Sequence, residues 1–387
     1  MARLSQAMAS TAILALVLCG HGAAETAAEA VPADEWPVYR GTRALIGRSA
    51  ATLPASLDKA WEFTLDGGLA GPAVVRDDTV YLTARGGLYL VGLADGVERK
   101  HIELAAGANS AVDIHDGTAV VALQNYAVQA IDLASGESRW QAEADDSVQG
   151  TPAIHIDEDG RAVVVFCSDD FNAYCHDLGT GERLWAFSTD NYIYGGAAIA
   201  QGKAVFGGCD QVLYAVDIAS GTSAKEALTP SYMQASPAVA WPLAFTGTGD
   251  KETGVFVCVD LEQEVEVWAY DAGEGPYVGI PAVGAEEVVF GGQDMVLYCL
   301  ERKTGSERWT FIADDSIAAA PTIVGDKVIC SVADGRIHLL DLATGRKLWS
   351  YDCGGGLFHG AAVAGGHVIV GTSRGRVLAF TGKATAD

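Results

Sequence analysis

The sequence predicts an all-β protein: an eight-bladed β-propeller of four-stranded antiparallel blades, with the ring closed by an N-terminal strand that completes the last blade. Three observations predict this fold. A motif recurs about every 41 residues, short alternating runs typical of strands separate its copies, and glycine is abundant, with 46 in 387 residues. Since 49% of the residues are hydrophobic and only 19% are charged, the chain can bury a large core.

In its full form the motif has an acidic residue, a glycine four positions later and a tryptophan eight positions later. The full copies are AIDLASGESRW (130–140), CHDLGTGERLW (175–185), CLERKTGSERW (299–309) and LLDLATGRKLW (339–349), and degenerate copies lie at 90–100, 215–225 and 258–268. The acidic residue can accept bonds from turn amides, and glycine tolerates a positive φ. We therefore expect a tight turn between the third and fourth strands of each repeat.

Each repeat holds about four strands of five residues, which is one propeller blade. Complete blades are predicted at 68–103, 109–143, 147–188, 193–228, 233–270, 277–312 and 316–352. Residues 357–380 supply three strands of an eighth blade, and Ala60-Trp61-Glu62-Phe63 supplies the fourth. This pairing removes two strand edges that an open ring would expose. The predicted propeller domain spans 59–383, between an N-terminal extension at 31–58 and a tail at 384–387.

Tryptophan recurs near the start of the predicted fourth strands. A large flat ring at this position is suited to packing between neighbouring blades, so we interpret these residues as a structural girdle. They are Trp61, Trp140, Trp185, Trp268, Trp309 and Trp349. Lys100 and Lys225 take the tryptophan position in two of the degenerate repeats.

The first 30 residues have the pattern of a secretory signal peptide: a basic start with Arg3, an apolar run at 11–18, and small residues that suit cleavage after Ala24 or Ala30. The apolar run is too short to span a bilayer, and no later stretch is long enough, so no membrane span is predicted. The protein is predicted to be exported, to the periplasm or outside the cell. Cys19 would allow a lipid anchor, although the residue before it is not the small one expected.

Charge and cysteine content exclude several classes of protein. A formal net charge of −25 repels phosphate backbones, so nucleic-acid binding is not expected. Beyond the signal, seven cysteines lie far apart, without a CxxC motif or a Cys/His cluster at zinc spacing, so a disulfide framework is not expected. Cys167 and Cys175 fall on adjacent predicted strands, and whether they pair is left open.

The pattern Ala-x-Asp-x-x-Thr-Gly-x-x-x-Trp resembles the repeat of the pyrroloquinoline-quinone (PQQ)-like propeller superfamily over essentially the whole chain after the signal. The resemblance implies two functional branches: PQQ-dependent alcohol dehydrogenases, and non-enzymatic relatives such as BamB-type outer-membrane assembly factors. The dehydrogenase branch carries a vicinal Cys-Cys disulfide, a Trp beneath the quinone, a Ca²⁺ site and an Asp base. This sequence has no Cys-Cys and no motif that matches the base. Its length, its blades, its export signal and its WPVYRG segment (36–41) resemble the BamB-type branch.

Aromatic residues recur just before the first strands of the blades, where they would line a channel mouth and anchor a partner. These candidates are Tyr192, Tyr194, Tyr232, Tyr277, Phe358 and His359. The alternative is that they pack loops or fill the axis. Paired acidic residues also recur; Asp145, Asp146, Asp314 and Asp315 would be either Ca²⁺ ligands or solvated turn residues.

The sequence thus predicts an exported, non-catalytic scaffold or binding protein with a protein partner, such as a BamB-like assembly factor. No catalytic, cofactor-binding or metal-binding residue is predicted. Two alternatives remain: a quinoprotein oxidoreductase that uses PQQ and Ca²⁺, and an extracellular module that binds glycans or peptides.

Overall fold

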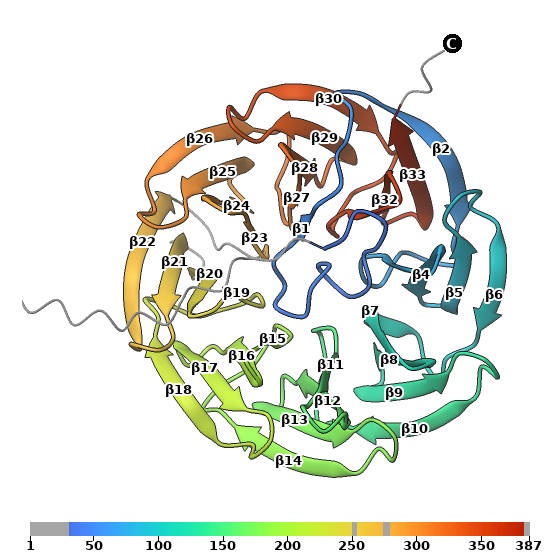
Figure 1. Cartoon of the computed structure of the whole chain (residues 1–387), viewed down its shortest axis with the longest axis vertical. Helices are drawn as coiled ribbons and strands as arrows, with labels where there is room; N and C mark the ends of the chain where they lie inside the picture. Colours follow the sequence, from blue (N-terminus) through green and yellow to red (C-terminus); the bar gives the residue numbers. More distant parts are fainter. Residues whose placement is uncertain (1–30, 250–253, 274–278, 383–387) are drawn as a thin grey trace, which may run out of the picture.

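The computed structural model describes residues 31–249, 254–273 and 279–382 and has the predicted fold, a ring of eight four-stranded antiparallel sheets around a central axis (Figure 1). In each sheet the first strand lies next to the axis and the fourth lies at the rim. The prediction of an eight-bladed propeller is therefore confirmed. The predicted signal peptide with Cys19, the tail and Tyr277 lie outside the described residues.

The first four blades follow one another along the chain. Their strands are β3 (Val74–Arg76), β4 (Thr79–Ala84), β5 (Gly87–Gly92) and β6 (Glu98–Ile102); β7 (Ala108–His115), β8 (Thr118–Leu123), β9 (Ala127–Asp132) and β10 (Ser138–Glu143); β11 (Ala153–Ile156), β12 (Ala162–Cys167), β13 (Asn172–Asp177) and β14 (Arg183–Ser188); β15 (Ala198–Ala200), β16 (Lys203–Gly207), β17 (Val212–Asp217) and β18 (Ser223–Leu228).

The last four blades include two strands from the N-terminal region: β1 (Arg48–Ser49), which pairs in parallel with the first strand of blade 7, and β2 (Leu57–Thr64), the outer strand of blade 8. The other strands are β19 (Ala238–Ala240), β20 (Leu243–Gly249), β21 (Gly254–Asp260) and β22 (Val265–Gly273); β23 (Ala282–Val283), β24 (Glu287–Gly291), β25 (Val296–Glu301) and β26 (Glu307–Ile312); β27 (Thr322–Val324), β28 (Lys327–Ser331), β29 (Arg336–Asp341) and β30 (Lys347–Asp352); β31 (Ala362–Ala364), β32 (His367–Gly371) and β33 (Arg376–Gly382).

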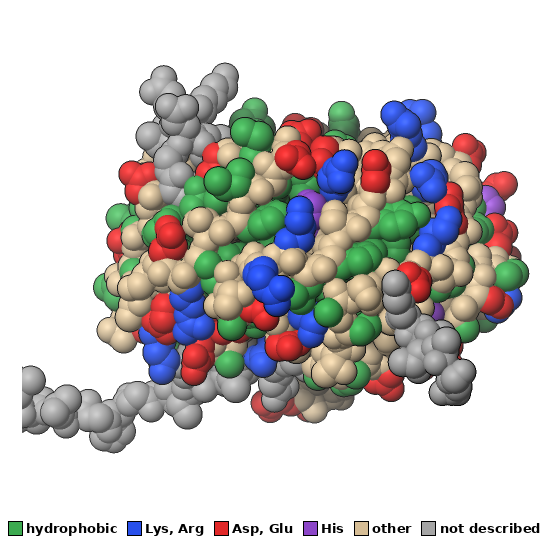
Figure 2. Space-filling model, turned by 90° about the horizontal axis from the view of Figure 1, so that it is seen from above, with side chains coloured by type: hydrophobic (Ala, Val, Ile, Leu, Met, Phe, Trp, Pro, Cys, Tyr) green, Lys and Arg blue, Asp and Glu red, His purple; other side chains and the backbone are tan. Residues whose placement is uncertain are grey.

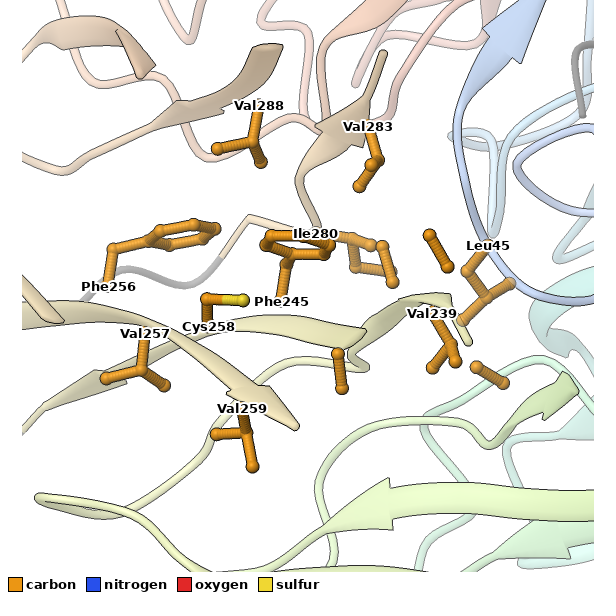
Figure 3. Packing of buried hydrophobic residues seen from close by; sticks show 14 of the residues in the cluster. Leu45, Val239, Phe245, Phe256, Val257, Cys258, Val259, Ile280, Val283 and Val288 are labelled. Atoms are coloured by element: carbon orange, nitrogen blue, oxygen red, sulfur yellow. The ribbon is translucent and has the colours of Figure 1, made fainter. Parts of the chain in front are cut away.

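The core consists of apolar layers between neighbouring blades. A middle strand such as β8 is buried along its whole length, because alternate side chains face the blade on either side. Figure 3 shows one such layer, in which Phe245, Phe256 and Cys258 of blade 5 lie beside Val288 of blade 6. Outer strands such as β10 expose most of their side chains. The middle strands are therefore buried on both faces, rather than at alternate residues.

A repeated contact joins the rims of neighbouring blades. The indole N–H of Trp140 donates to the carbonyl of Leu178 in the next blade (2.7 Å), and a Cβ at Gly181 would lie 2.6 Å from the same ring. The turn glycine therefore provides both a positive φ, +74°, and room for the tryptophan. The same bond joins Trp61 to Leu93, Trp185 to Ile218, Trp268 to Arg302 and Trp309 to Leu342, while Trp349 packs against Phe380 at the ring closure.

Lysine makes a similar contact where a repeat lacks tryptophan. Nζ of Lys100 donates to the carbonyl of Leu133 (2.9 Å), and Nζ of Lys225 donates to the carbonyl of Glu262 (2.9 Å). In these repeats too, a side chain of one blade therefore donates a hydrogen bond to a backbone carbonyl of the next blade.

The ring is closed by antiparallel pairing of β2 with β33, and a cluster of charges reinforces this seam. The guanidinium of Arg376 donates to both carboxylate oxygens of Glu62 (2.6 and 2.9 Å), and Nζ of Lys59 donates to the same carboxylate (2.9 Å). The bonds from Arg376 and Lys59 lower the pKa of Glu62 to about 2. The two ends of the chain are thus joined by main-chain and charge-assisted bonds.

On the edge of the ring in view, Lys and Arg side chains alternate with Asp and Glu side chains (Figure 2). This part of the rim is a mixed, solvated surface, without a large patch of one sign. None of the described residues belongs to a helix with the length and apolarity that crossing a membrane requires.

Residues 31–53, which we call the plug, cross the centre of the ring (Figure 1). The backbone of Trp36 exchanges two hydrogen bonds with Val75 of blade 1 (3.0 and 2.8 Å). Other plug carbonyls accept from first-strand or turn amides of blades 4 to 8; the pairs are Ile199 to Arg43, Val239 to Ala44, Val283 to Ile46, Ile323 to Gly47 and Gly365 to Ala33. The predicted N-terminal extension is thus part of the propeller core.

Side chains of the plug complete these contacts. The guanidinium of Arg40, which is 2% exposed, donates to the carbonyls of Pro321 (2.7 Å) and Pro281 (2.9 Å). Arg43 pairs with the buried carboxylate of Asp113 on blade 2 (3.2 Å), which also accepts from the amide of Ile154 on blade 3 (2.8 Å). Together with the backbone bonds, these contacts link the plug directly to seven blades, and Asp113 extends the link to blade 3.

Candidate functional site: the open end of the channel

At the end of the channel opposite the plug, the loops that lead into the eight first strands converge around the axis. They enclose a cavity of about 200 Å³, and Tyr39 of the plug lies at its base. The loops approach so closely that a Cβ at Gly71 would lie 2.0 Å from the backbone nitrogen of Ala111, and one at Gly150 would lie 2.3 Å from Cα of Gly196. Glycine is therefore required where adjacent loops meet.

The structure brings three of the predicted channel-mouth residues together in the wall of this cavity: Tyr194, Phe358 and His359. Nε2 of His359 lies 3.1 Å from the carbonyl of Leu69 and must carry the proton, because a carbonyl can only accept. Burial lowers the pKa of His359, so the imidazole is neutral at neutral pH. This histidine fixes a loop, and among the described residues it has no acidic partner that would make it a general base.

The other described candidates lie on the surrounding face. Tyr192 is 40% exposed and stacks on Tyr194, with the ring centroids 5.5 Å apart and the planes 8° apart. Phe171 meets Tyr192 edge to face at 4.8 Å. Tyr232, 41% exposed, lies in the loop between β18 and β19 and is not among the residues that line the cavity.

Sequence reasoning missed a second set of residues on this face, in the turns between the second and third strands. Four of these turns have an exposed residue with a positive φ of 66–74°: Tyr126, Phe171, Gln211 and Met295. Blades 7 and 8 have Gly335 and Gly375 at the equivalent position. A side chain in the left-handed region costs about 1 kcal/mol relative to glycine. The sequence contained a signal for these positions: in most blades the turn residue with positive φ directly precedes the third strand and follows an Asp or Asn.

The paired acidic residues of this end make local turn contacts. Asp146 accepts from the amide of Ser147, Asp315 accepts from the amide of Ser316, and the amide of Asp145 donates to Asp170. Within the described residues there is no group of three or more His, Cys, Asp or Glu side chains that could hold a metal ion. These contacts are those of turn residues.

The seven described cysteines are free thiols. Cys175, Cys258 and Cys299 are fully buried on third strands. Cys167 lies opposite Ala173 and Cys175 opposite Val165, so the two cysteines are offset along the paired strands β12 and β13. Burial raises the pKa of Cys175 and Cys299 to about 12, so these thiols are unreactive core groups at neutral pH.

A larger hollow of about 430 Å³ adjoins the axial cavity over blades 8, 1 and 2. Arg85, Gln124 and Ser373 line it, together with Phe358 and His359, which it shares with the axial cavity. Arg85 gives this part of the face a positive charge, whereas the aspartate pairs 145–146, 169–170 and 314–315 lie in loops of blades 3 and 7. The open end is therefore electrostatically asymmetric.

The lining of the axial cavity does not suit PQQ. The quinone is a tricarboxylate that needs cationic or donor-rich partners, and its metal needs several oxygen ligands. Among the described lining residues there is no Lys, Arg, Asp, Glu, Cys or Trp, and the single histidine is occupied by a loop carbonyl. We therefore derive no reaction step through a quinone at this position.

Comparison with known proteins agrees with the fold. A family model described as outer membrane protein assembly factor BamB matches residues 50–170 and 251–385, which is more than half of the chain. No curated protein matches the sequence. Among solved structures, BamB from Moraxella catarrhalis is 16% identical, with a TM-score of 0.70, and the alignment covers 84% of this chain and 99% of that one.

A solved enzyme structure is equally similar in fold. The quinohemoprotein alcohol dehydrogenase from Comamonas testosteroni is 14% identical, with a TM-score of 0.72, and the alignment covers 91% of this chain and 81% of that one. The computationally designed protein Ika8 is 16% identical with a TM-score of 0.71, covering 82% of this chain and 98% of the design. At these identities the similarity concerns the fold alone.

Proposed function

The chain belongs to the family of outer membrane protein assembly factor BamB, and we propose that it is an exported, non-catalytic propeller that binds a protein partner at the open end of its channel. The observation that carries this proposal is the set of exposed side chains at Tyr126, Phe171 and Met295, retained at positive φ where sister blades use glycine. Such strain supports a function when it gathers on one surface.

The shape and charge of the two ends support the same assignment. The plug fills one end with buried main-chain contacts, whereas the other presents aromatic side chains around a shallow, polar cavity. Exposed aromatic residues on a rigid scaffold are typical anchors of protein interfaces. Export to the periplasm, and association with the outer membrane, are part of this proposal and are supported by the family.

Site-specific photocrosslinking in cells of the native organism tests the proposal. A photoreactive phenylalanine analogue is placed at Tyr232 on the open end and, as a matched control, at Asp159, an exposed turn residue between β11 and β12 at the opposite end. We expect a discrete crosslinked protein from position 232 and none from position 159. Equal crosslinking from both positions, or none from either, would contradict binding at the open end.

A further inference from the structure

An aromatic cluster on blades 3 and 4 lies next to a buried carboxylate, one oxygen of which has no hydrogen-bond partner among the described residues. Phe171, from the turn between β12 and β13, contacts Tyr192, and Tyr192 stacks on Tyr194, which lines the axial cavity. Phe171 and Tyr192 are 38% and 40% exposed. The cluster thus presents ring surface to solvent at the rim of the cavity.

The carboxylate is that of Asp169, which is 7% exposed. Its Oδ2 accepts from Nε2 of Gln149 (2.5 Å), a residue of the cavity wall. Its Oδ1 has no hydrogen-bond partner among the described residues. Buried polar atoms are normally satisfied, so an unpartnered carboxylate oxygen beside a residue of the cavity wall indicates a donor that comes from outside the chain.

The local electrostatics favour a positively charged donor. Burial raises the pKa of Asp169, and the negative charges of Asp146 and Asp170 raise it further. Burial raises the pKa of the Tyr194 hydroxyl, and the negative charges of Asp169 and Asp146 raise it further. The charged groups that act on Asp169 in the described chain are therefore carboxylates, and their mutual repulsion would be relieved by an incoming cation.

We propose that Asp169 and the rings of Phe171, Tyr192 and Tyr194 form a pocket for a lysine or arginine side chain of the partner protein. The cation would donate to the free oxygen of Asp169 and lie against the aromatic rings, which attract cations through their negative faces. This inference rests on the proposed function and adds the chemistry by which the partner is recognised.

An organic cation fits this pocket better than a metal ion does. Ca²⁺ requires six to eight converging oxygens, and within the described residues no group of three or more His, Cys, Asp or Glu side chains could hold a metal ion. A cation carried on a protein segment also fits the surroundings, because exposed Tyr232 and Met295 lie on the same end of the ring and can contact residues on either side of it. A small free amine bound in this pocket would not contact Tyr232 or Met295.

The test measures binding of a fluorescein-labelled peptide, Gly-Ser-Gly-Arg-Gly-Ser-Gly, to the purified chain by anisotropy in 150 mM salt. The comparison peptide has citrulline, a neutral isostere, in place of arginine. We expect the arginine peptide to bind at least tenfold more tightly. The salt screens the general attraction of a cation to a chain with a net charge of −25.

Variants locate the effect. Asp169→Asn should weaken binding of the arginine peptide at least tenfold, and Tyr192→Leu, which keeps the bulk of an exposed side chain, should weaken it about fivefold. Asp159→Asn makes the same change of charge at the opposite end and should change binding less than twofold. Because Tyr192 is exposed, this variant tests the pocket even if Asp169→Asn fails to fold.

Three outcomes would overturn the pocket: equal binding of the two peptides, no binding of either, or equal loss in Asp159→Asn and Asp169→Asn. If crosslinking from Tyr232 persists in any of these cases, the proposed scaffold function stands and only the cation pocket is rejected. If that crosslinking is also absent, both proposals fail.

Discussion

At one end of the channel, the plug occupies main-chain donors of the first strands and turns, whereas at the other end eight loops converge on a cavity that no segment of the described chain fills. The closed end has Trp36 and Arg40 buried at 1% and 2% exposure, while the open end has Tyr192 and Tyr232 at 40% and 41%. The same eight strands therefore serve two purposes: their closed end stabilises the ring, and their open end is available for recognition.

The largest expected effect is at the closed end. Trp36→Ala removes a fully buried ring that contacts the plug itself and blade 1, so it should lower the free energy of unfolding by about 3–5 kcal/mol. Urea unfolding followed by tryptophan fluorescence and circular dichroism measures this change. Tyr232→Ala, on the open end, is the matched aromatic truncation and should stay within about 0.5 kcal/mol of the wild type. Similar losses in both variants would contradict the division between the two ends.

The buried carboxylate of Asp113 tests how the plug is attached. It accepts from the amides of Ile114 and Ile154 as well as from Arg43. Burial raises the pKa of Asp113, which shows that the cost of burying its charge offsets part of the attraction to Arg43. Asp113→Asn should therefore lower the free energy of unfolding mainly because one buried amide loses its acceptor. The expected loss is about 1–3 kcal/mol.

The control for Asp113→Asn is a solvent-exposed ion pair at the rim. Arg139→Gln breaks the pair with Asp132 and should change stability far less than Asp113→Asn does, because water screens an exposed pair. Thermal unfolding of both variants measures the difference. A loss in Arg139→Gln as large as that in Asp113→Asn would show that burial of the plug contact has no special weight.

The seam at Glu62 makes a smaller, pH-dependent contribution. Because bonds from Arg376 and Lys59 lower its pKa from 4.5 to about 2, the stabilisation is complete above pH 4.5 and is lost as the pH falls toward 2. The pair is partly exposed, so its contribution is about 1 kcal/mol at most. The difference in thermal midpoint between the wild type and Glu62→Gln should be constant at neutral pH, shrink as the pH falls through 4.5 and disappear only below pH 2; a difference that does not shrink over this range would contradict this assignment.

The sequence predicted the ring because its signals are local and repeated: the acidic residue, the turn glycine and the tryptophan recur at fixed spacing within each blade. The plug has no such signal. Arg40 meets Pro321 across 281 positions, and Arg43 meets Asp113 across 70, so neither contact follows from a short pattern. A run with Trp36, Leu45 and Ile46 indicates burial, yet only the closed ring determines where it lies.

The candidate site was partly predictable for the same reason. Position just before a first strand placed Tyr194, Phe358 and His359 near the axis, since every first strand begins there. The exposed turn residues were not predicted, because glycine is the usual residue at positive φ and these turns have larger side chains there. Asp169 could not be singled out, because the missing partner of its Oδ1 is a property of the folded structure.

The smallest expected effect concerns the strained turns of the open end and has the opposite sign. Met295 has a φ of +69° and is 44% exposed, so Met295→Gly relieves the left-handed strain of about 1–2 kcal/mol and incurs the entropy cost of glycine, about 0.5–1 kcal/mol. The variant should therefore be more stable by roughly 0.5 kcal/mol, measured by urea unfolding.

The reverse change completes this test. Gly335 occupies the equivalent turn of blade 7 with a φ of +96°, and a Cβ there would lie 2.8 Å from the carbonyl oxygen of Gly355. Gly335→Ala should therefore destabilise the protein by about 1–2 kcal/mol. If Met295→Gly instead lowered stability by more than about 1 kcal/mol, the side chain would contribute to packing. A gain in stability would mean that Met295 is retained at a cost, as expected of a residue whose contact is with a partner.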